Sequence, residues 1–270
     1  MIQSAQMTCR FLGLQARDSA LLCMPLRYIA GKMVVVRALV AQLDLRLAVP
    51  SGHPLAHVKR SPTFAAMIPL QIYNSLQHKE EQIMLMGIKQ LLIGGGTIDT
   101  ALEQAIRTLP GAIYSTYGMT ETLSHIALRR LNGPQASPRY TPLEGVQVSL
   151  SEEGTLRIEA PLVCDQPLVT NDVARLYPDG NFIILGRKDN IINTGGIKIQ
   201  IEEVEQSLKP ILNHPFAITS LPDPKFGERI VLLYTGDALA PDSLISLPKY
   251  QRPKSIFYTH EIPLTETGKI

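Results

Sequence analysis

The sequence is poor in cysteine, in net charge and in long apolar runs. Its three cysteines, Cys9, Cys23 and Cys164, are far apart and odd in number, which argues against a disulfide framework and fits a reducing compartment. The net charge of +2, without any run of basic residues, argues against a nucleic-acid surface. The longest apolar run, around residues 33–36, is flanked by charged side chains and is too short to span a bilayer. We therefore expect a cytoplasmic protein without nucleic-acid or membrane partners.

Two further patterns are missing. The N-terminal residues lack the basic-then-apolar order of a secretion signal. The histidines are scattered, and the close pair His53 and His57 is separated by Pro54, which breaks a helical face, so a histidine metal site is not favoured. What remains is an ordinary globular composition, with 270 residues and 45% hydrophobic content, enough for two domains or one large one.

Short apolar strands alternate with helices over the first half of the chain. Predicted strands cover residues 20–24, 45–49, 64–68, 90–93 and 112–114. Predicted helices cover residues 1–12, 29–43, 71–77, 80–86 and 100–109. This alternation is typical of an α/β fold with a mostly parallel sheet, over residues 1–139.

The pattern changes after Pro138. Short alternating strands at 146–150, 154–158 and 182–185 predict a small β unit over residues 140–188. The remaining residues, 189–270, predict a small α+β module. Its expected elements are a hairpin over 189–199, a helix over 200–208, strands at 217–221, 230–235 and 255–258, and a short helix over 242–247.

Residues 117–122 read Tyr-Gly-Met-Thr-Glu-Thr and follow a predicted strand. Tyr117 can stack on a base, and Gly118 stands where a backbone can come close to a ligand. Thr120 can donate to a phosphate oxygen, and Glu121 is a hard oxygen ligand suited to Mg²⁺. The alternative interpretation is a strand-to-helix turn with a threonine cap.

A run of three glycines, Gly94, Gly95 and Gly96, ends another predicted strand, where ligands bind open α/β sheets. A dinucleotide fingerprint would need a further glycine at position 99, which is Asp99. The run therefore predicts a close backbone approach to a different ligand, or only a tight turn.

Charged residues and glycines recur later in the chain. Asp172 can accept hydrogen bonds from ribose hydroxyls, although an Asx turn is the common fate of a lone aspartate. Arg187 offers a bidentate fork to phosphate or ribose, and Lys269 is a compact charge suited to a developing oxyanion. Gly195 and Gly196 allow unusual backbone torsions. Solvated turns and loops are the alternative for all of these.

Taken in order, these stretches resemble the adenylate-forming superfamily of acyl-CoA synthetases, aryl-CoA ligases and peptide-synthetase adenylation domains. The matching stretches are 94–96, 117–122, 170–172, 186–189, 195–198 and 268–269. Residues 23–31 are similar to the acyl-pocket motif of that superfamily. The compact length and residues 247–254 look most like the o-succinylbenzoate–CoA ligases of menaquinone synthesis.

The resemblance implies an acyl-CoA synthetase-like fold, with a partial AMP-binding core over 1–188 and a C-terminal lid domain over 189–270. It implies ATP, Mg²⁺, CoA and a small-molecule carboxylate as reactants and cofactors, with a homodimer as the candidate assembly. The carboxylate attacks the α-phosphate of ATP and gives an acyl-adenylate. The lid then rotates, and the CoA thiolate attacks the adenylate.

The resemblance also assigns roles to residues. The nucleotide-binding set is Gly94, Gly95, Gly96, Thr116, Tyr117, Gly118, Asp172 and Arg187. The catalytic set is Thr120 on the α-phosphate, Glu121 on Mg²⁺ and Lys269 between the carboxylate and the phosphate. The hinge is Asp189, and Gly195, Gly196 and Lys198 face the CoA channel. The substrate-pocket set is Arg27, Tyr28 and Gly31.

Several departures from the superfamily pattern stand beside the matches. The phosphate-gripping loop that precedes the first helix in the superfamily has no counterpart, and the chain stops one residue after Lys269. Asn171 replaces the glycine of a Thr-Gly-Asp motif, and Arg27 with Tyr28 replaces a Tyr-His pair. Arg27 suits a dicarboxylate such as succinylbenzoate, or is a surface cation.

From these departures we expect a fragment with impaired adenylation. The alternatives are an inactive relic that binds a nucleotide or a partner, and a ligase that loads the phosphopantetheine of a carrier protein.

Overall fold

The computed structural model describes residues 1–96, 98–240 and 243–263. Contacts divide the chain into two compact units. The first comprises Met1–Ser149, Arg157–Leu168 and Leu176–Ile183, and the second comprises Leu150–Leu156, Val169–Arg175 and Ile184–Ile270. The predicted domain boundary at 188/189, with its hinge near Asp189, stays a prediction.

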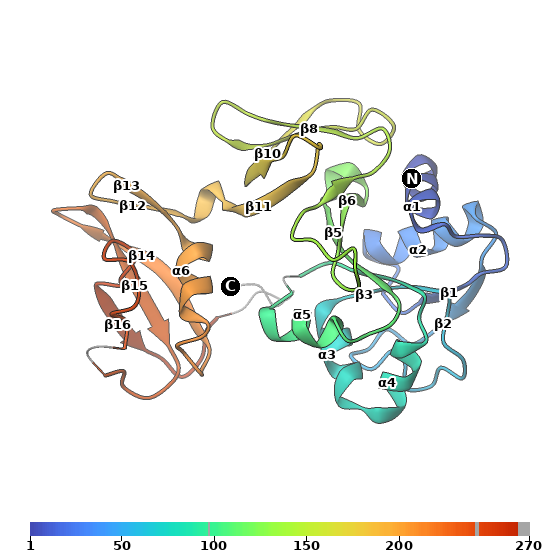
Figure 1. The fold of residues 1–270 in the computed structure, drawn as a ribbon, viewed down its shortest axis with the longest axis horizontal. Coiled ribbons are helices and arrows are strands. Elements are labelled where there is room, and N and C mark those ends of the chain that lie inside the picture. Colours follow the sequence, from blue (N-terminus) through green and yellow to red (C-terminus); the bar gives the residue numbers. More distant parts are fainter. Residues whose placement is uncertain (97, 241–242, 264–270) are drawn as a thin grey trace. The chain divides into compact units, whose positions relative to one another are not determined.

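The first unit contains a seven-stranded sheet of order β2-β1-β3-β4-β5-β6-β7 (Figure 1). Its strands are β1 (Ser19–Leu22), β2 (Asp44–Leu47), β3 (Phe64–Met67), β4 (Gln90–Ile93), β5 (Ala112–Gly118), β6 (His125–Arg130) and β7 (Thr141–Pro142). In that order, β2, β1, β3, β4 and β5 pair in parallel. Strand β6 pairs with β5, and β7 with β6, in antiparallel fashion. The predicted α/β class with a mostly parallel sheet is confirmed.

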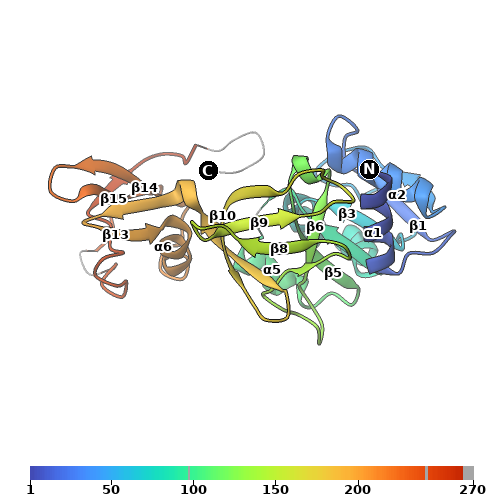
Figure 2. The same ribbon diagram turned by 90° about the horizontal axis from the view of Figure 1, so that it is seen from above.

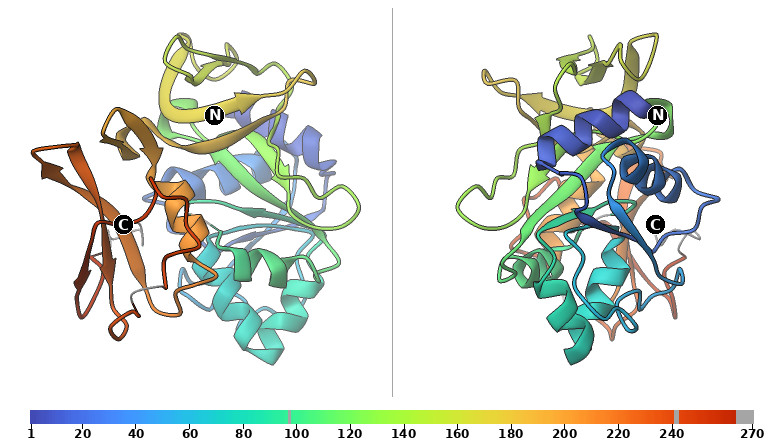
Figure 3. Two further views of the ribbon diagram at one scale, coloured as in Figure 1. Left: turned by 60° about the vertical axis from the view of Figure 1, so that its left-hand side comes forward. Right: turned by 90° about the vertical axis from the view of Figure 1, so that its right-hand side faces the viewer.

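Within the described residues of this unit, five helices cover the two faces of the sheet. They are α1 (Ile2–Leu12), α2 (Ile29–Val40), α3 (Pro69–Gln77), α4 (Lys79–Met86) and α5 (Thr100–Ile106). Helices α1 and α2 lie on one face, and α3, α4 and α5 lie on the other (Figure 3). Helix α1 ends at Gly13, whose φ of 65° suits glycine, and α5 begins at Asp99, whose carboxylate accepts from the Leu102 N–H. None of the helices among the described residues has the length and apolar character needed to cross a membrane.

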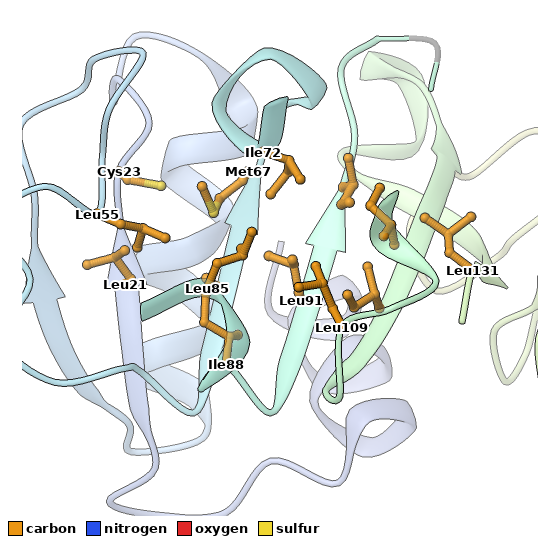
Figure 4. Packing of buried hydrophobic residues seen from close by; sticks show 14 of the residues in the cluster. Leu21, Cys23, Leu55, Met67, Ile72, Leu85, Ile88, Leu91, Leu109 and Leu131 are labelled. Carbon is orange, nitrogen blue, oxygen red and sulfur yellow. The ribbon is translucent and has the colours of Figure 1, made fainter. Parts of the chain in front are cut away.

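Side-chain alternation along the strands separates the core from the opposite face. Odd-numbered residues such as Met67, Leu91 and Ile113 pack with α3, α4 and α5 in one hydrophobic cluster (Figure 4). Fully burying each such side chain contributes about 1.5–3 kcal/mol. Because alternate residues of a strand point to opposite faces, Ala66 and Leu92 point to the face covered by α2.

The structure corrects three local expectations in this unit. Helix and strand do not alternate throughout, because residues 48–63 between β2 and β3 form no helix. Residues 117–122 connect a strand to a short 3-10 helix rather than to an α-helix. Strand β5 runs on to Gly118, a 3-10 helix covers Thr120–Thr122, and the chain returns as antiparallel β6, which sequence analysis missed.

A small sheet of order β11-β10-β9-β8 follows (Figure 2). Its strands are β8 (Gln147–Leu150), β9 (Thr155–Glu159), β10 (Leu168–Leu176) and β11 (Phe182–Arg187). Strand β10 was not predicted, and Asp172 lies within it.

The C-terminal sheet has the order β13-β12-β15-β14, with β16 paired to β15. Its elements are β12 (Ile191–Thr194), β13 (Ile197–Gln200), α6 (Ile201–Leu208), β14 (Phe216–Asp223), β15 (Gly227–Tyr234) and β16 (Ser255–Tyr258). Gly195 and Gly196 form the two-residue hairpin loop, with φ values of 60° and 81° that favour glycine. The predicted helix over 242–247 is wrong for its described part, because residues 243–246 form turns.

Candidate functional site

A cavity of about 260 Å³ lies in the first unit, at the carboxyl ends of β3, β4 and β5. Side chains from the α2 side of the sheet line it, because Ala66, Leu92 and Thr116 share one strand face. Its lining residues are Met24, Ile29, Ala30, Arg37, Ala66, Met67, Ile68, Leu92, Gly94, Gly95, Thr116, Gly118, Met119, Thr120, Ser124 and His125. The carboxyl edge of parallel strands is where open α/β sheets bind ligands. The mostly apolar wall suits an apolar or aromatic group.

Two of the predicted site glycines lie where a Cβ would meet a neighbour, and for Gly118 that neighbour is backbone. A Cβ at Gly118 would lie 2.3 Å from the Ser124 carbonyl oxygen, because β5 and β6 approach closely there. A Cβ at Gly94 would lie 2.3 Å from Thr116 Oγ1. Both glycines also line the cavity, so a role beside a nucleotide stays a prediction for them.

Tyr117 belongs to an aromatic cluster rather than to the cavity lining. Its ring centroid lies 5.7 Å from that of Tyr140 and 5.3 Å from that of Phe182. Tyr140 and Phe182 also pair through their backbones. The neighbouring Thr116 points to the cavity, since successive strand residues point to opposite faces. Stacking of Tyr117 on a base stays a prediction.

Thr120 and Glu121 are exposed on the 3-10 helix, and Thr120 lines the cavity. The Thr122 hydroxyl fixes this turn by accepting from the Met119 N–H at 3.1 Å. Across the parts of the chain that the structure describes, no group of three or more His, Cys, Asp or Glu side chains could hold a metal ion. A single exposed carboxylate is nevertheless the kind of donor that Mg²⁺ uses when phosphate and water supply its other oxygens.

The end of the cavity against α1 and α2 contains a chain of polar side chains. Arg37, only 2% exposed, donates from Nη2 to Ser124 Oγ at 2.8 Å. Ser124 Oγ lies 3.3 Å from His125 Nδ1, and His125 Nε2 lies 2.9 Å from Thr8 Oγ1. The Nε of Arg37 is buried and has no hydrogen-bond partner among the described residues.

Arg37 carries a positive charge that no described carboxylate balances. None of the ion pairs found within residues 1–96, 98–240 and 243–263 includes it. Burial lowers the pKa of Arg37 to about 10, so it stays cationic at neutral pH. Burial, and then the charge of Arg37, lower the pKa of His125 well below its ordinary value and keep it neutral. Burial also raises the pKa of the Cys9 thiol beside Arg37.

Sequence analysis missed Arg37, His125 and Thr8. Arg37 was visible only as a charge at the end of an apolar run of α2. A charged residue on the inner face of an apolar helix is the signal that could have found it, because such residues are buried only when paired or when they bind a ligand. Thr8 and His125 are 117 positions apart, and no local pattern joins them.

The second unit brings together four residues around the predicted ribose site. Arg187 Nη1 lies 3.5 Å from Asp172 Oδ1, and Arg187 Nη2 donates to Asp189 Oδ2 at 2.9 Å. Asn171 Nδ2 donates to both Asp189 oxygens, at 3.1 and 3.3 Å. The hydrogen bond from Arg187 holds the pKa of Asp189 below its ordinary value. The roles of Asp172, Arg187 and Asp189 stay predictions.

The predicted acyl-pocket residues lie outside the cavity lining. Arg27 is exposed, and its guanidinium lies 4.8 Å from the Tyr28 ring centroid. Gly31 is buried under the preceding loop, where a Cβ would meet the Pro25 carbonyl oxygen at 2.5 Å. Lys198 is exposed on β13, and Lys269 lies outside the described residues. Their functional roles stay predictions.

Comparison with known proteins identifies the family. A family model described as AMP-binding enzyme matches residues 1–162. The 2-succinylbenzoate–CoA ligase of Lactococcus lactis is 26% identical over 96% of this chain and 62% of its own length. The enzyme of that name from Salmonella typhimurium is 28% identical over 94% of this chain and 56% of its own length. The chain thus spans about three fifths of these two relatives.

Solved structures show the same fold. An AMP-forming acyl-CoA synthetase-like protein from Dyadobacter fermentans is 32% identical, with a TM-score of 0.70, over 100% of this chain and 80% of its own. The o-succinylbenzoate CoA synthetase from Bacillus subtilis, in complex with its acyl-adenylate, has a TM-score of 0.80 at 21% identity, over 99% of this chain and 62% of its own. The expected acyl-CoA synthetase-like fold is thereby confirmed.

Proposed function

Because this chain belongs to the AMP-binding enzyme family, we propose that it is an AMP-forming acid–CoA ligase whose acyl substrate carries a second carboxylate. The observation that carries the proposal is the buried, unbalanced Arg37 beside a mostly apolar cavity. The curated relatives are named for 2-succinylbenzoate, an aromatic compound with two carboxylates. One carboxylate would be activated by ATP, and the other would accept hydrogen bonds from Arg37.

The energetics favour an anion at this position. A buried charge without a partner is costly, and a carboxylate that accepts from it removes part of that cost. Hydrogen bonds between a guanidinium and a carboxylate are about twice as strong as neutral ones. Apolar neighbours such as Met24, Ile29 and Leu92 would pack on the aromatic ring. The cavity therefore favours an aromatic dicarboxylate over a monocarboxylate of similar size.

The proposed chemistry has two steps. A carboxylate oxygen attacks the α-phosphorus of ATP, and the bond to pyrophosphate breaks. The CoA thiolate then attacks the acyl carbon, and AMP leaves. We assign Thr120 to donate to the α-phosphate and Asp172 with Arg187 to hold the ribose, on the resemblance. On the same resemblance, Lys269 stabilises the negative charge between the carboxylate and the α-phosphate in the first step. Asp189 serves as the hinge, and Gly195, Gly196 and Lys198 face the CoA channel.

Glu121 is the residue proposed to hold Mg²⁺. A bound Mg²⁺ would neutralise charge on the phosphates. The single exposed carboxylate fits that ion, because the phosphates of ATP supply further oxygens.

The test is binding, which does not depend on turnover. Calorimetry compares sulfamoyl-adenosine analogues of the acyl-adenylate that carry either a 2-succinylbenzoyl or a plain benzoyl group. We expect the dicarboxylate-derived analogue to bind at least tenfold more tightly, and Arg37→Gln to remove the difference. Lys32→Gln, an exposed cation on the same helix, is the matched control. Equal affinities for the two analogues, or a difference that survives Arg37→Gln, would contradict the proposal.

A further inference from the structure

We propose that His125, held by Thr8 in one ring tautomer, is a positioning residue that sets the selectivity of the cavity for a second carboxylate. It acts through Ser124, which anchors the guanidinium of Arg37. The inference rests on the proposed function, since it takes Arg37 as the group that meets the substrate anion.

The hydrogen positions follow from the acceptors that are present. The Thr8 hydroxyl donates to the Ser4 carbonyl at 3.0 Å, so its hydrogen is already committed. The contact of 2.9 Å between Thr8 Oγ1 and His125 Nε2 therefore needs the hydrogen on Nε2. In a neutral ring, Nδ1 is then the acceptor, and it takes the hydroxyl hydrogen of Ser124.

In this order of donors, Ser124 can only accept a hydrogen bond from Arg37. Its hydrogen points to His125, so its lone pairs accept from Arg37 Nη2 at 2.8 Å. The donors run in one direction, from Arg37 through Ser124, His125 and Thr8 to the Ser4 carbonyl. The guanidinium is thus fixed through one end, and its Nε is left over.

The other tautomer would disturb this arrangement. With the hydrogen on Nδ1, the unprotonated Nε2 would face the lone pairs of Thr8, whose own hydrogen is on the Ser4 carbonyl. Nδ1–H would then donate to Ser124 and release the Ser124 hydrogen toward other acceptors. Thr8, which is fully buried on α1, is therefore the residue that selects the tautomer. Ser124 and His125 both line the cavity, so the choice of tautomer changes the donors and acceptors of the cavity wall.

Four variants separate a positioning role from simple packing. Thr8→Val keeps the volume but removes the acceptor, and Thr8→Ser keeps the hydroxyl. His125→Leu removes both ring nitrogens, and His125→Gln offers an amide NH2 donor and a carbonyl acceptor in place of the neutral ring. We expect Thr8→Val and His125→Leu to lose selectivity, and the two conservative variants to retain it.

The experiment measures the ratio of affinities for the 2-succinylbenzoyl and benzoyl analogues by calorimetry, on the full chain. Thr8→Val and His125→Leu should lower this ratio about tenfold, while AMP binding shows that each variant is folded. The ¹⁵N spectrum of the imidazole should show the Nε2–H tautomer in the parent and in Thr8→Ser, and its loss in Thr8→Val.

Two outcomes would overturn the inference. One is an unchanged affinity ratio in both Thr8→Val and His125→Leu, which would make His125 a packing residue only. The other is a parent imidazole spectrum of the Nδ1–H tautomer. A parent protein that does not distinguish the two analogues would instead contradict the proposed function, while the imidazole spectrum would still report the tautomer. The two failures are therefore distinguishable.

Discussion

Arg37 donates to Ser124 Oγ at 2.8 Å while its buried Nε meets no acceptor among the described residues. A buried cation that is held at one end and unsatisfied at the other costs stability unless an anion arrives. The arrangement therefore lowers the stability of the ligand-free protein and favours binding of an anionic ligand.

Replacing Arg37 should change both the stability of the ligand-free protein and its stabilisation by a ligand. We expect Arg37→Met to raise the free energy of unfolding of the ligand-free protein by about 1–2 kcal/mol, because an apolar side chain of similar length removes an uncompensated buried charge. The same variant should lose the stabilisation that the 2-succinylbenzoyl analogue gives the parent. Urea unfolding with and without the analogue measures both effects, and Lys32→Met is the control. A ligand-free variant less stable than the parent would contradict this account.

Gly118 tests the tight approach of β5 and β6. Gly118→Ala places a Cβ 2.3 Å from the Ser124 carbonyl oxygen, and the backbone must shift to relieve the clash. We expect a loss of about 1–3 kcal/mol in the free energy of unfolding. Gly96→Ala is the matched control, because its Cβ would meet only Pro69 side-chain atoms at 3.5 Å or more. Similar losses in both variants would argue against a specific clash at Gly118.

Glu81 is a buried carboxylate that sequence analysis did not single out. It accepts from the Leu55 N–H at 3.3 Å and from Ser75 Oγ at 3.0 Å, and its other oxygen lies 2.8 Å from His53 Nδ1. Glu81→Leu leaves these groups without their acceptor, so we expect a loss of about 3–5 kcal/mol. Glu80→Leu, at the exposed neighbouring position, should change stability by less than about 0.5 kcal/mol. Chemical denaturation provides the comparison, and a loss below about 1 kcal/mol in Glu81→Leu would show that the cluster contributes little.

His125 should make stability depend on pH. Its pKa in the folded protein lies well below the ordinary 6.5, because burial and the charge of Arg37 disfavour the imidazolium. Below about pH 6.5 the unfolded chain therefore binds a proton that the folded chain does not. Stability falls as the pH is lowered, by up to about 1.4 kcal/mol per pH unit, until the folded pKa is reached.

The measurement is the free energy of unfolding between pH 7.5 and pH 5, for the parent and for His125→Gln. Glutamine does not titrate, so the gap between the two proteins should change with pH in favour of His125→Gln at the acid end. A constant gap across this range would show that His125 titrates alike in the folded and unfolded states.

Periodicity and turn chemistry were enough to predict much of the fold. The apolar runs at 90–93 and 64–68 match β4 and β3 closely, and α1 ends at Leu12, as the predicted helix over 1–12 does. These elements are local, since a few neighbouring residues decide them. The predictions failed where partners distant in sequence decide the structure. Strand β6 forms because it pairs with β5, and residues 243–246 make turns although their sequence favoured a helix.

The sequence by itself determined the α/β class and the order of the motifs that place this chain among AMP-binding enzymes. Only the tertiary structure showed that Gly118 is required by the Ser124 carbonyl and that Arg37, rather than the exposed Arg27, lines the cavity. Arg37, Ser124, His125 and Thr8 come from α2, the turn before β6, β6 itself and α1, and folding brings them together. The physical reason is that burial and hydrogen-bond partners, which decide the charge and orientation of a side chain, depend on segments far apart along the chain.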